Sequence, residues 1–295
     1  MSKYKLYAQK SNYYGKPTDK DLEKACINSY SNKKEDKKLR GLDYFSSYDL
    51  KSGLNADVYY NDDYLLVVFR GTEWKQPNDW NTDFIMGRRK EIPQQFYEAD
   101  RLWNRLQDRD MFPDRKVIAT GHSLGGSISV YLGNKYGDKA VAFCPYGIGD
   151  IVEPRKDASN ITNYGNPKDW VFMSNEQNQI GNIKYVFNKH NFNGETDAKI
   201  EQFALFHFLQ NYGDINYATE DISGEEYLQN MSKAYDTNRL SVEEQLMYES
   251  ITRQIKDNYN YTDNLNNCPG YVYVHNYMRN GKEVNGYTRN CPYHD

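Results

Sequence analysis

The stretch Val117-Ile-Ala-Thr-Gly121-His122-Ser123-Leu124-Gly125-Gly126 decides the fold of this chain. A short run of β-favouring residues enters a Gly-x-Ser-x-Gly turn, and the small and apolar residues after it favour a helix. This strand–turn–helix order is typical of a nucleophile elbow, in which a serine sits in a sharp, strained bend. Gly121 and Gly125 lack the Cβ atoms that would obstruct the close approach of strand and helix. The pattern predicts Ser123 as a nucleophile at a helix N-terminus, where unpaired N–H groups favour developing negative charge.

The composition excludes several classes of protein. With 295 residues, the chain can form one α/β domain and an appendage. The mean hydropathy of −0.94 is polar for a globular enzyme, and 28 tyrosines supply core area that Leu and Val would otherwise provide. The formal net charge is −4, with acidic and basic residues interspersed. No basic stripe is present, so nucleic-acid binding is not expected.

The sequence also predicts where the protein is located and whether its cysteines are reduced. The first residues contain no apolar secretory leader, and no run approaches 18 apolar residues, so no transmembrane segment is expected. A cytoplasmic location is the default expectation, and export by a signal-less route stays open. Four cysteines are too few for a disulfide scaffold. Cys144, in an apolar run, is expected to be a buried, reduced thiol.

Strand-like and helix-like segments alternate along the first two thirds of the chain. Strands are expected over 54–60, 64–69, 117–120, 140–144, 161–164 and 185–187. Helices are expected over 20–31, 92–109, 124–136, 201–212, 225–235 and 241–256. Such alternation predicts a mostly parallel sheet with helices on both faces.

The C-terminal residues form a separate unit in this interpretation. We expect a main domain over residues 1–256 and an appendage over residues 257–295. The appendage begins with a polar linker at 257–269. A β-hairpin follows, with strands at 271–279 and 282–289 around Asn280-Gly281, a strong hairpin turn signal.

A serine nucleophile needs a base, and the order serine, acid, histidine restricts the search to residues after the elbow. Four histidines lie there: His190, His207, His275 and His294. His190 is favoured because it occupies a loop directly after a strand-like run. His207 lies in an apolar helical stretch and is interpreted as a core histidine, although it stays open as the base.

Asp169 is the favoured acid because it follows a strand-like run and a turn. Asp150 is its main rival, and a surface salt bridge is the plainer interpretation of Asp169. His122 is adjacent to the serine in sequence, but its side chain should point elsewhere. We expect His122 to be a structural hydrogen-bonding residue.

Two backbone donors are expected to form an oxyanion hole. The N–H of Leu124, the residue after the nucleophile, is one. The second should come from the loop after the strand 64–69, where Gly71 permits close approach and Thr72 offers an N–H and a hydroxyl.

Four segments together resemble the class 3 lipases, the fungal-lipase-like α/β-hydrolases, over roughly residues 20–215. They are Phe69-Arg-Gly-Thr72, Asp79-Trp-Asn-Thr-Asp83, the elbow Gly121–Gly126, and Asn166-Pro-Lys-Asp169 followed by a histidine. The resemblance implies an α/β-hydrolase fold, with a mostly parallel central sheet flanked by helices. The C-terminal helical segment and the hairpin would be additions to it.

The resemblance also implies roles for individual residues. Ser123, Asp169 and His190 would be the triad, and Thr72 and Leu124 the oxyanion donors. Asp83 would orient Thr72, and no metal or cofactor would be needed.

The implied activity is serine-dependent hydrolysis of lipid-type carboxylic esters through an acyl-enzyme. In such lipases, the segment after Arg-Gly-Thr often forms a lid. Here that segment, residues 73–80, is short and, except for Trp74 and Trp80, polar. This composition favours phospholipids or small, hydrated esters over triglycerides, with transient contact at a membrane surface. Acyl preference and oligomeric state stay open.

Two other functions remain compatible with the sequence. The same residues could hydrolyse peptides or thioesters, because fold and triad do not fix the substrate. Alternatively, a non-catalytic binding or structural protein could use the C-terminal hairpin. Cys268 and Cys291 bracket that hairpin, and free thiols, a disulfide or a zinc site with His275 and His294 all stay open.

Overall fold

The computed structural model describes most of the main domain and part of the tail. The described residues are 11–71, 92–107, 111–189, 206–234, 240–266, 271–274, 277–279, 282–284 and 287–290. His190, Thr72, Asp83, Cys268 and Cys291 lie outside them, as do His275 and His294.

Strand β4 (Lys116–His122) lies in the middle of a seven-stranded sheet whose strands follow chain order, β1 to β7. The antiparallel part contains β1 (Asp43–Asp49), β2 (Asn55–Tyr60) and β3 (Tyr64–Phe69). From β3 onward every pairing is parallel, through β4, β5 (Lys139–Phe143), β6 (Ile161–Gly165) and β7 (Asn182–Tyr185). The predicted mostly parallel sheet is therefore confirmed.

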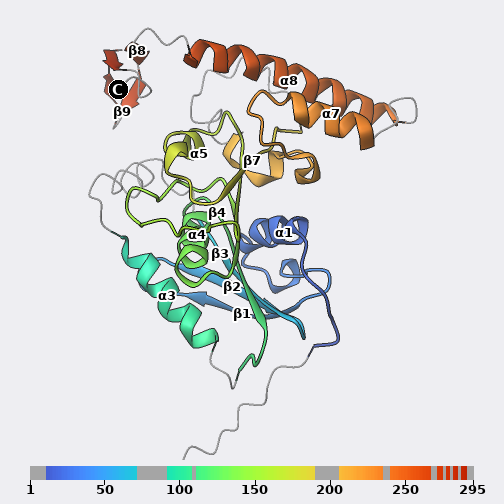
Figure 1. Ribbon diagram of the computed structural model, residues 1–295, viewed down its shortest axis with the longest axis vertical. Helices are drawn as coiled ribbons and strands as arrows, with labels where there is room; N and C mark the ends of the chain where they lie inside the picture. The colour runs from blue at the N-terminus through green and yellow to red at the C-terminus, as the bar shows by residue number, and fades with distance from the viewer. Residues whose placement is uncertain are drawn as a thin grey trace, which may run out of the picture.

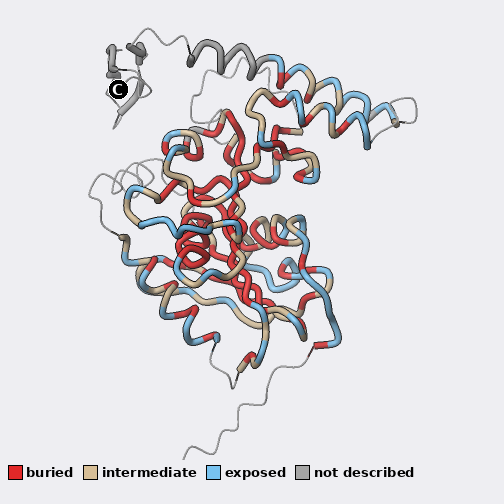
Figure 2. The backbone as a smooth tube through the Cα atoms, in the orientation of Figure 1, coloured by how far each residue is buried: buried red, intermediate tan, exposed pale blue. Residues whose placement is uncertain are grey.

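Helices cover both faces of this sheet (Figure 1). Helix α1 (Asp19–Ser29) packs on one face with Leu66 and Val68. Helices α3 (Gln94–Leu106) and α4 (Leu124–Tyr136) pack on the other, with Leu65 and Val67. Adjacent residues of β3 thus belong to different cores, as the two-residue period of a strand requires. Buried positions gather along the central strands and α4 (Figure 2).

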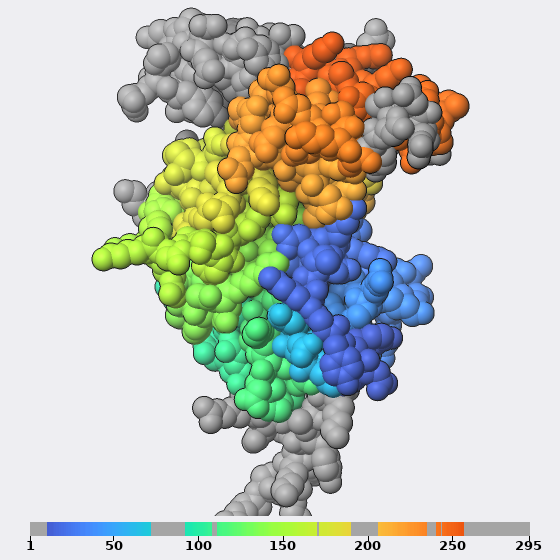
Figure 3. Space-filling model, turned by 45° about the vertical axis from the view of Figure 1, so that its right-hand side comes forward, coloured from blue at the N-terminus to red at the C-terminus, as the bar shows by residue number. Residues whose placement is uncertain are grey.

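A third cluster joins the C-terminal helices to the end of the sheet. Helix α5 (Trp170–Met173), α7 (Glu225–Ala234) and α8 (Val242–Asn266) contribute Phe172, Tyr227 and Ile255 to it, together with Phe187 after β7. Helices α7 and α8 cover this end of the molecule (Figure 3). No helix in the described residues has the length and apolar character that a membrane span needs.

Several expected elements have different bounds in the structure. The helix predicted over 201–212 does not continue to residue 212: among its described residues, 206–207 are helical, Phe208 is extended, and a 3₁₀ turn follows at Leu209–Asn211. The His207 carbonyl accepts side-chain donors at this break. Strand β7 covers Asn182–Tyr185, so it ends at the first residue of the strand predicted over 185–187. Strand β1 was not predicted, because its mostly half-exposed residues show no apolar alternation.

The tail contains the predicted hairpin but not the predicted start of the linker. Helix α8 continues to Asn266, so residues 257–266, expected as irregular linker, are helical. Beyond it, β8 (Tyr271–Val274) pairs with β11 (Tyr287–Asn290), and β9 (Tyr277–Arg279) pairs with β10 (Lys282–Val284). Arg279 lies opposite Lys282, the register expected for strands on either side of the Asn280-Gly281 signal.

Candidate active site

Ser123 occupies a strained bend between β4 and α4. Its φ of 57° and ψ of −127° are unusual for a residue with a side chain. Two hydrogen bonds hold this conformation: the Ser123 N–H donates to Phe143 O at 2.9 Å, and Ser123 O accepts from the Ser127 N–H at 3.1 Å. Strand β5 and helix α4 thus hold Ser123 in a backbone conformation that would otherwise relax.

The two glycines of the motif are required by backbone contacts. A Cβ on Gly121 would lie 2.2 Å from Gly125 O, and a Cβ on Gly125 would lie 2.1 Å from Phe69 O. Real carbon and oxygen atoms never approach so closely without covalent bonding. The elbow therefore tolerates only glycine at these positions.

The Ser123 hydroxyl lies beside the N-terminus of α4. The residue is 2% exposed, and its Oγ has no hydrogen-bond partner among the described residues. Leu124 begins the helix, so its N–H has no acceptor within α4. The helix dipole adds positive potential at this end. The arrangement suits an oxygen that gains negative charge.

Asp169 and His207 form a fully buried pair. His207 Nδ1 lies 2.8 Å from Asp169 Oδ2, and both side chains are 0% exposed. Asp169 immediately precedes α5, and its Oδ1 accepts from the Val171 N–H at 2.9 Å. This bond holds the carboxylate so that its other oxygen faces the imidazole. An imidazole held through Nδ1 can exchange protons only through Nε2.

His122 connects the elbow to the His207 segment. Its Nε2 lies 2.8 Å from His207 O, and the two rings are 4.7 Å apart between centroids. A carbonyl oxygen can only accept, so Nε2 carries the proton. Nδ1 must then accept, and the Tyr30 hydroxyl, at 2.8 Å, donates to it. Burial lowers the pKa of His122 to about 3, and His207 adds to this effect, so the ring is neutral near pH 7.

Tyr30 extends this connection to the end of β3. Its hydroxyl lies close to Gly71, because a Cβ on Gly71 would fall 2.8 Å from it. Burial raises the pKa of Tyr30 well above its ordinary value, which keeps the phenol protonated and able to donate. One chain of hydrogen bonds therefore runs from Tyr30, beside Gly71, through His122 to the His207 backbone.

Cys144 completes the buried polar cluster around His207. Its thiol donates to His207 O at 3.2 Å and lies 2.7 Å from the Tyr212 hydroxyl. The ligand atoms of His122, Cys144 and His207 lie within 4.8 Å of one another. However, both nitrogens of His122 are already engaged, and burial raises the pKa of the Cys144 thiol well above its usual value. Since metals bind the thiolate, the cluster suits a hydrogen-bond network better than a metal.

The structure brings Ser123, Leu124 and Asp169 of the predicted site to the C-terminal edge of the parallel strands, where α/β sheets bind ligands. Asp150 is exposed and lies 3.4 Å from the Asn175 amide, apart from the buried pair. His190, Thr72 and Asp83 lie outside the described residues.

The histidine that faces Asp169 is His207, which the sequence interpretation placed in the core. The expectation that it is buried holds, but its environment contains a carboxylate. The apolar neighbours of His207 concealed this pairing. The only signal in the sequence was that His207, like His190, follows the acid in the required order.

Part of this chain is similar to known lipases and phospholipases. A protein-family model described as a Tle-like phospholipase domain matches residues 11–177. The extracellular phospholipase A1 of Serratia liquefaciens is 28% identical over 152 residues, which make up 48% of this chain and 46% of that protein. A Pichia angusta sequence named for the lipase ATG15 is 28% identical over 116 residues, 34% of this chain and 21% of that protein. The chain therefore spans less than half the length of either relative.

Two solved lipase structures are also similar to this chain. The Lip2 lipase of Yarrowia lipolytica has a TM-score of 0.41 and 12% identity, covering 62% of this chain and 83% of that one. The Rhizomucor miehei lipase has a TM-score of 0.38 and 14% identity, covering 64% and 75%.

Proposed function

The chain belongs to the family of Tle-like phospholipase domains, and from this we propose that it hydrolyses lipid-type carboxylic esters through Ser123, His207 and Asp169. The observation that carries the proposal is the buried Asp169–His207 hydrogen bond of 2.8 Å, which the His122–His207 hydrogen bond joins to the strained elbow at Ser123. Triads are recognised by such geometry and roles, and not by sequence position.

Each of the three residues has one role in this proposal. Asp169 orients His207 through Nδ1 and stabilises the imidazolium that forms during the reaction. Nε2 of His207 takes the proton of Ser123 as its Oγ attacks the ester carbonyl carbon. The imidazolium then gives that proton to the departing alcohol, which leaves an acyl-enzyme. A water molecule, activated by the same nitrogen, releases the carboxylic acid.

The oxyanion formed during attack needs donors already in position. The Leu124 N–H at the start of α4 supplies one in this proposal. Thr72, which follows Gly71, remains the proposed second donor, with Asp83 orienting it. Gly71, the residue before Thr72, lies against the Tyr30 side chain, because a Cβ on Gly71 would fall 2.8 Å from its hydroxyl.

The proposed substrates are phospholipids or other lipid esters. The family is described by phospholipase activity, and one relative is named a phospholipase A1. The short, polar 73–80 segment of the sequence also favours a hydrated ester over a triglyceride. Transient binding at a lipid surface is part of this proposal.

Labelling with a fluorophosphonate, mapped by mass spectrometry, tests the proposal. We expect one adduct, on Ser123, and none in Ser123→Ala. His207→Ala should label far more slowly, because the serine loses its base. Hydrolysis of ester, thioester and amide analogues with one acyl group then separates a lipase from a peptide or thioester hydrolase. A protein that neither labels nor hydrolyses any of the three would be a non-catalytic scaffold.

A further inference from the structure

Gln254 is a buried polar side chain on the apolar face of helix α8. It is 1% exposed and lies on the same face as Ile251 and Ile255, which pack in the third cluster. Burying an amide costs free energy unless its oxygen and its nitrogen both find partners. The backbone of Asn188, which follows β7, supplies a partner to each of them.

The pairing of Asn188 with Tyr212 explains why its backbone needs this amide. The two residues form an isolated antiparallel bridge, and its hydrogen bonds come from the residues on either side of them. In such a pair, the N–H and C=O of Asn188 itself point to the opposite edge. There Gln254 Oε1 accepts from the Asn188 N–H at 3.0 Å, and Nε2 donates to Asn188 O at 3.2 Å. The glutamine amide thus takes the place of a neighbouring strand.

The side chain of Asn188 continues this path to the turn that carries the acid. Its Oδ1 accepts from Asn166 Nδ2 at 2.8 Å, and both side chains are 0% exposed. Asn166 closes the turn, because its O accepts from the Asp169 N–H and its Oδ1 from the Lys168 N–H, each at 2.9 Å. Asp169 in turn bonds to His207. A path of buried hydrogen bonds therefore leads from α8 to the acid of the proposed triad.

We propose that Gln254 is a positioning residue, which holds the turn of Asp169 in place through Asn188, so that helix α8 completes the site. The inference rests on the proposed function, because it concerns the orientation of the acid in that triad. Displacement of a catalytic group by about 1 Å can lower a rate about a hundredfold, so support at this distance matters. Both supporting residues lie outside residues 11–177, which match the family model.

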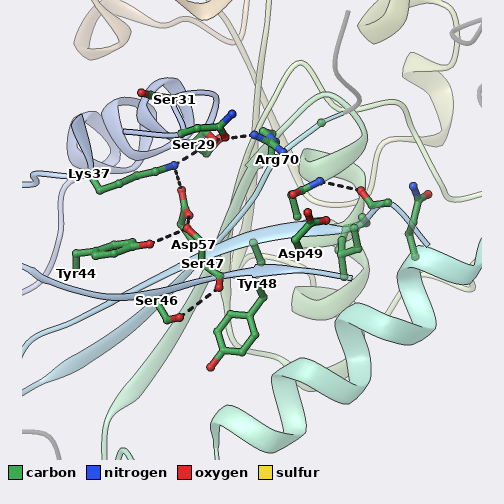
Figure 4. A pocket seen from close by; sticks show the side chains of 18 of the residues that line it. Ser29, Ser31, Lys37, Tyr44, Ser46, Ser47, Tyr48, Asp49, Asp57 and Arg70 are labelled. Carbon is green, nitrogen blue, oxygen red and sulfur yellow. Dashed lines mark hydrogen bonds and ion pairs between the residues drawn. The ribbon is translucent and has the colours of Figure 1, made fainter. Parts of the chain in front are cut away.

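A cavity beside the nucleophile lies apart from this path. It has a volume of about 960 Å³, extends along β1 and β2, and ends at Gly71 and Leu124 (Figure 4). Among the described residues, none that lines it belongs to α8 or to the turn of Asp169. A substrate in this cavity would keep its contacts when Gln254 is changed. Substitution of Gln254 should therefore act on kcat and not on KM.

Gln254→Leu, with Ile251→Val as a matched control, tests the proposal. Leucine has a similar volume but forms no hydrogen bond, so the Asn188 backbone loses both contacts with the amide. Ile251 lies on the same face of α8, and its side chain contributes packing alone. Both variants should lower Tm. Only Gln254→Leu should also lower kcat for a p-nitrophenyl ester, by about tenfold with KM unchanged. A wild-type kcat in Gln254→Leu, or an equal loss in Ile251→Val, would overturn the proposal.

A second variant breaks the path one step later. Asn188→Ala removes the side chain that accepts from Asn166 but keeps the backbone groups that bond to Gln254. It should lower kcat by a similar factor. In the double variant Asn188→Ala/Gln254→Leu, kcat should fall no further than in the more impaired single variant, because both changes act on one path. Multiplication of the two losses would show that Gln254 does not act through Asn188, and the proposal would be wrong.

Proton NMR separates this proposal from the proposed reaction. The proton between His207 Nδ1 and Asp169 should give a low-field resonance in the wild type, because a charge-assisted hydrogen bond deshields it. We expect this resonance to move or broaden in Gln254→Leu and to stay in place in Ile251→Val. The measurement needs no turnover, so its result holds even if no ester is hydrolysed. A resonance that is the same in Gln254→Leu and the wild type would overturn the positioning role and leave the proposed reaction untouched.

Discussion

His122 Nε2 donates to the backbone oxygen of His207 at 2.8 Å, so the residue beside the nucleophile holds the segment that carries the partner of Asp169. The strained turn and the proposed base are thereby joined directly. Tyr30 bonds to His122 and also lies against Gly71, so one side chain contacts both the elbow and the end of β3.

Removal of the imidazole of His207 should abolish activity. His207→Ala is expected to lower kcat for a p-nitrophenyl ester by about four orders of magnitude, the loss typical of a triad member. His190→Ala should remain close to wild type. Steady-state kinetics of both variants decide between the two histidines. A large loss in His190→Ala alone would restore His190 as the base.

Tyr30→Phe should impair both stability and catalysis. Without the hydroxyl, Nδ1 of His122 is a buried acceptor that has lost its donor, which costs about 1–3 kcal/mol of unfolding free energy. The value is measured by urea denaturation. In kinetics, kcat should fall while KM changes little, because the base segment and Gly71 lose their shared support. Tyr14→Phe is the control, since Tyr14 is 70% exposed. A wild-type kcat in Tyr30→Phe would restrict this chain of hydrogen bonds to a structural role.

The buried, neutral His122 should make the protein sensitive to acid. Its folded-state pKa is lowered to about 3, so between pH 6.5 and 3 the unfolded state binds a proton that the folded state does not. This contribution is complete above pH 6.5 and is lost as the pH falls toward 3. The slope approaches about 1.4 kcal/mol per pH unit. Unfolding free energies at pH 7 and 5 should therefore differ less in His122→Gln, and an unchanged difference would contradict the assignment.

The elbow glycines should be intolerant of a methyl group. Gly125→Ala would place a carbon 2.1 Å from Phe69 O, so the strand and helix must separate or the protein must unfold. The matched control is Gly126→Ala, whose nearest contact would be 3.1 Å and therefore needs only a small shift. Thermal unfolding should show a much larger decrease in Tm for Gly125→Ala. Similar decreases for both variants would mean that the close approach at Gly125 is not critical.

The sequence predicted the elbow and the sheet because each depends on local pattern. Gly121, Ser123 and Gly125 carry their own geometric requirement, and apolar runs mark the central strands. The partner of Asp169 could not be chosen from sequence, since the pairing depends on how residues 38 positions apart meet after folding. The contact between Tyr30 and His122 could not be predicted either, because the two residues are 92 positions apart in the sequence.

The C-terminal hairpin and the helix before it should contribute differently to stability. Ile251 and Ile255 of α8 are 1% and 4% exposed and pack in the cluster that contains Phe187, so this part of α8 belongs to the core of the main domain. Deletion of residues 241–295 should therefore destabilise the protein by several kcal/mol, since each buried isoleucine lost typically costs about 2–5 kcal/mol. Deletion of residues 267–295 leaves α8 intact and should preserve both Tm and turnover of a water-soluble ester. Loss of folding in this shorter deletion would place the hairpin within the main domain, and the appendage predicted over 257–295 would then be wrong.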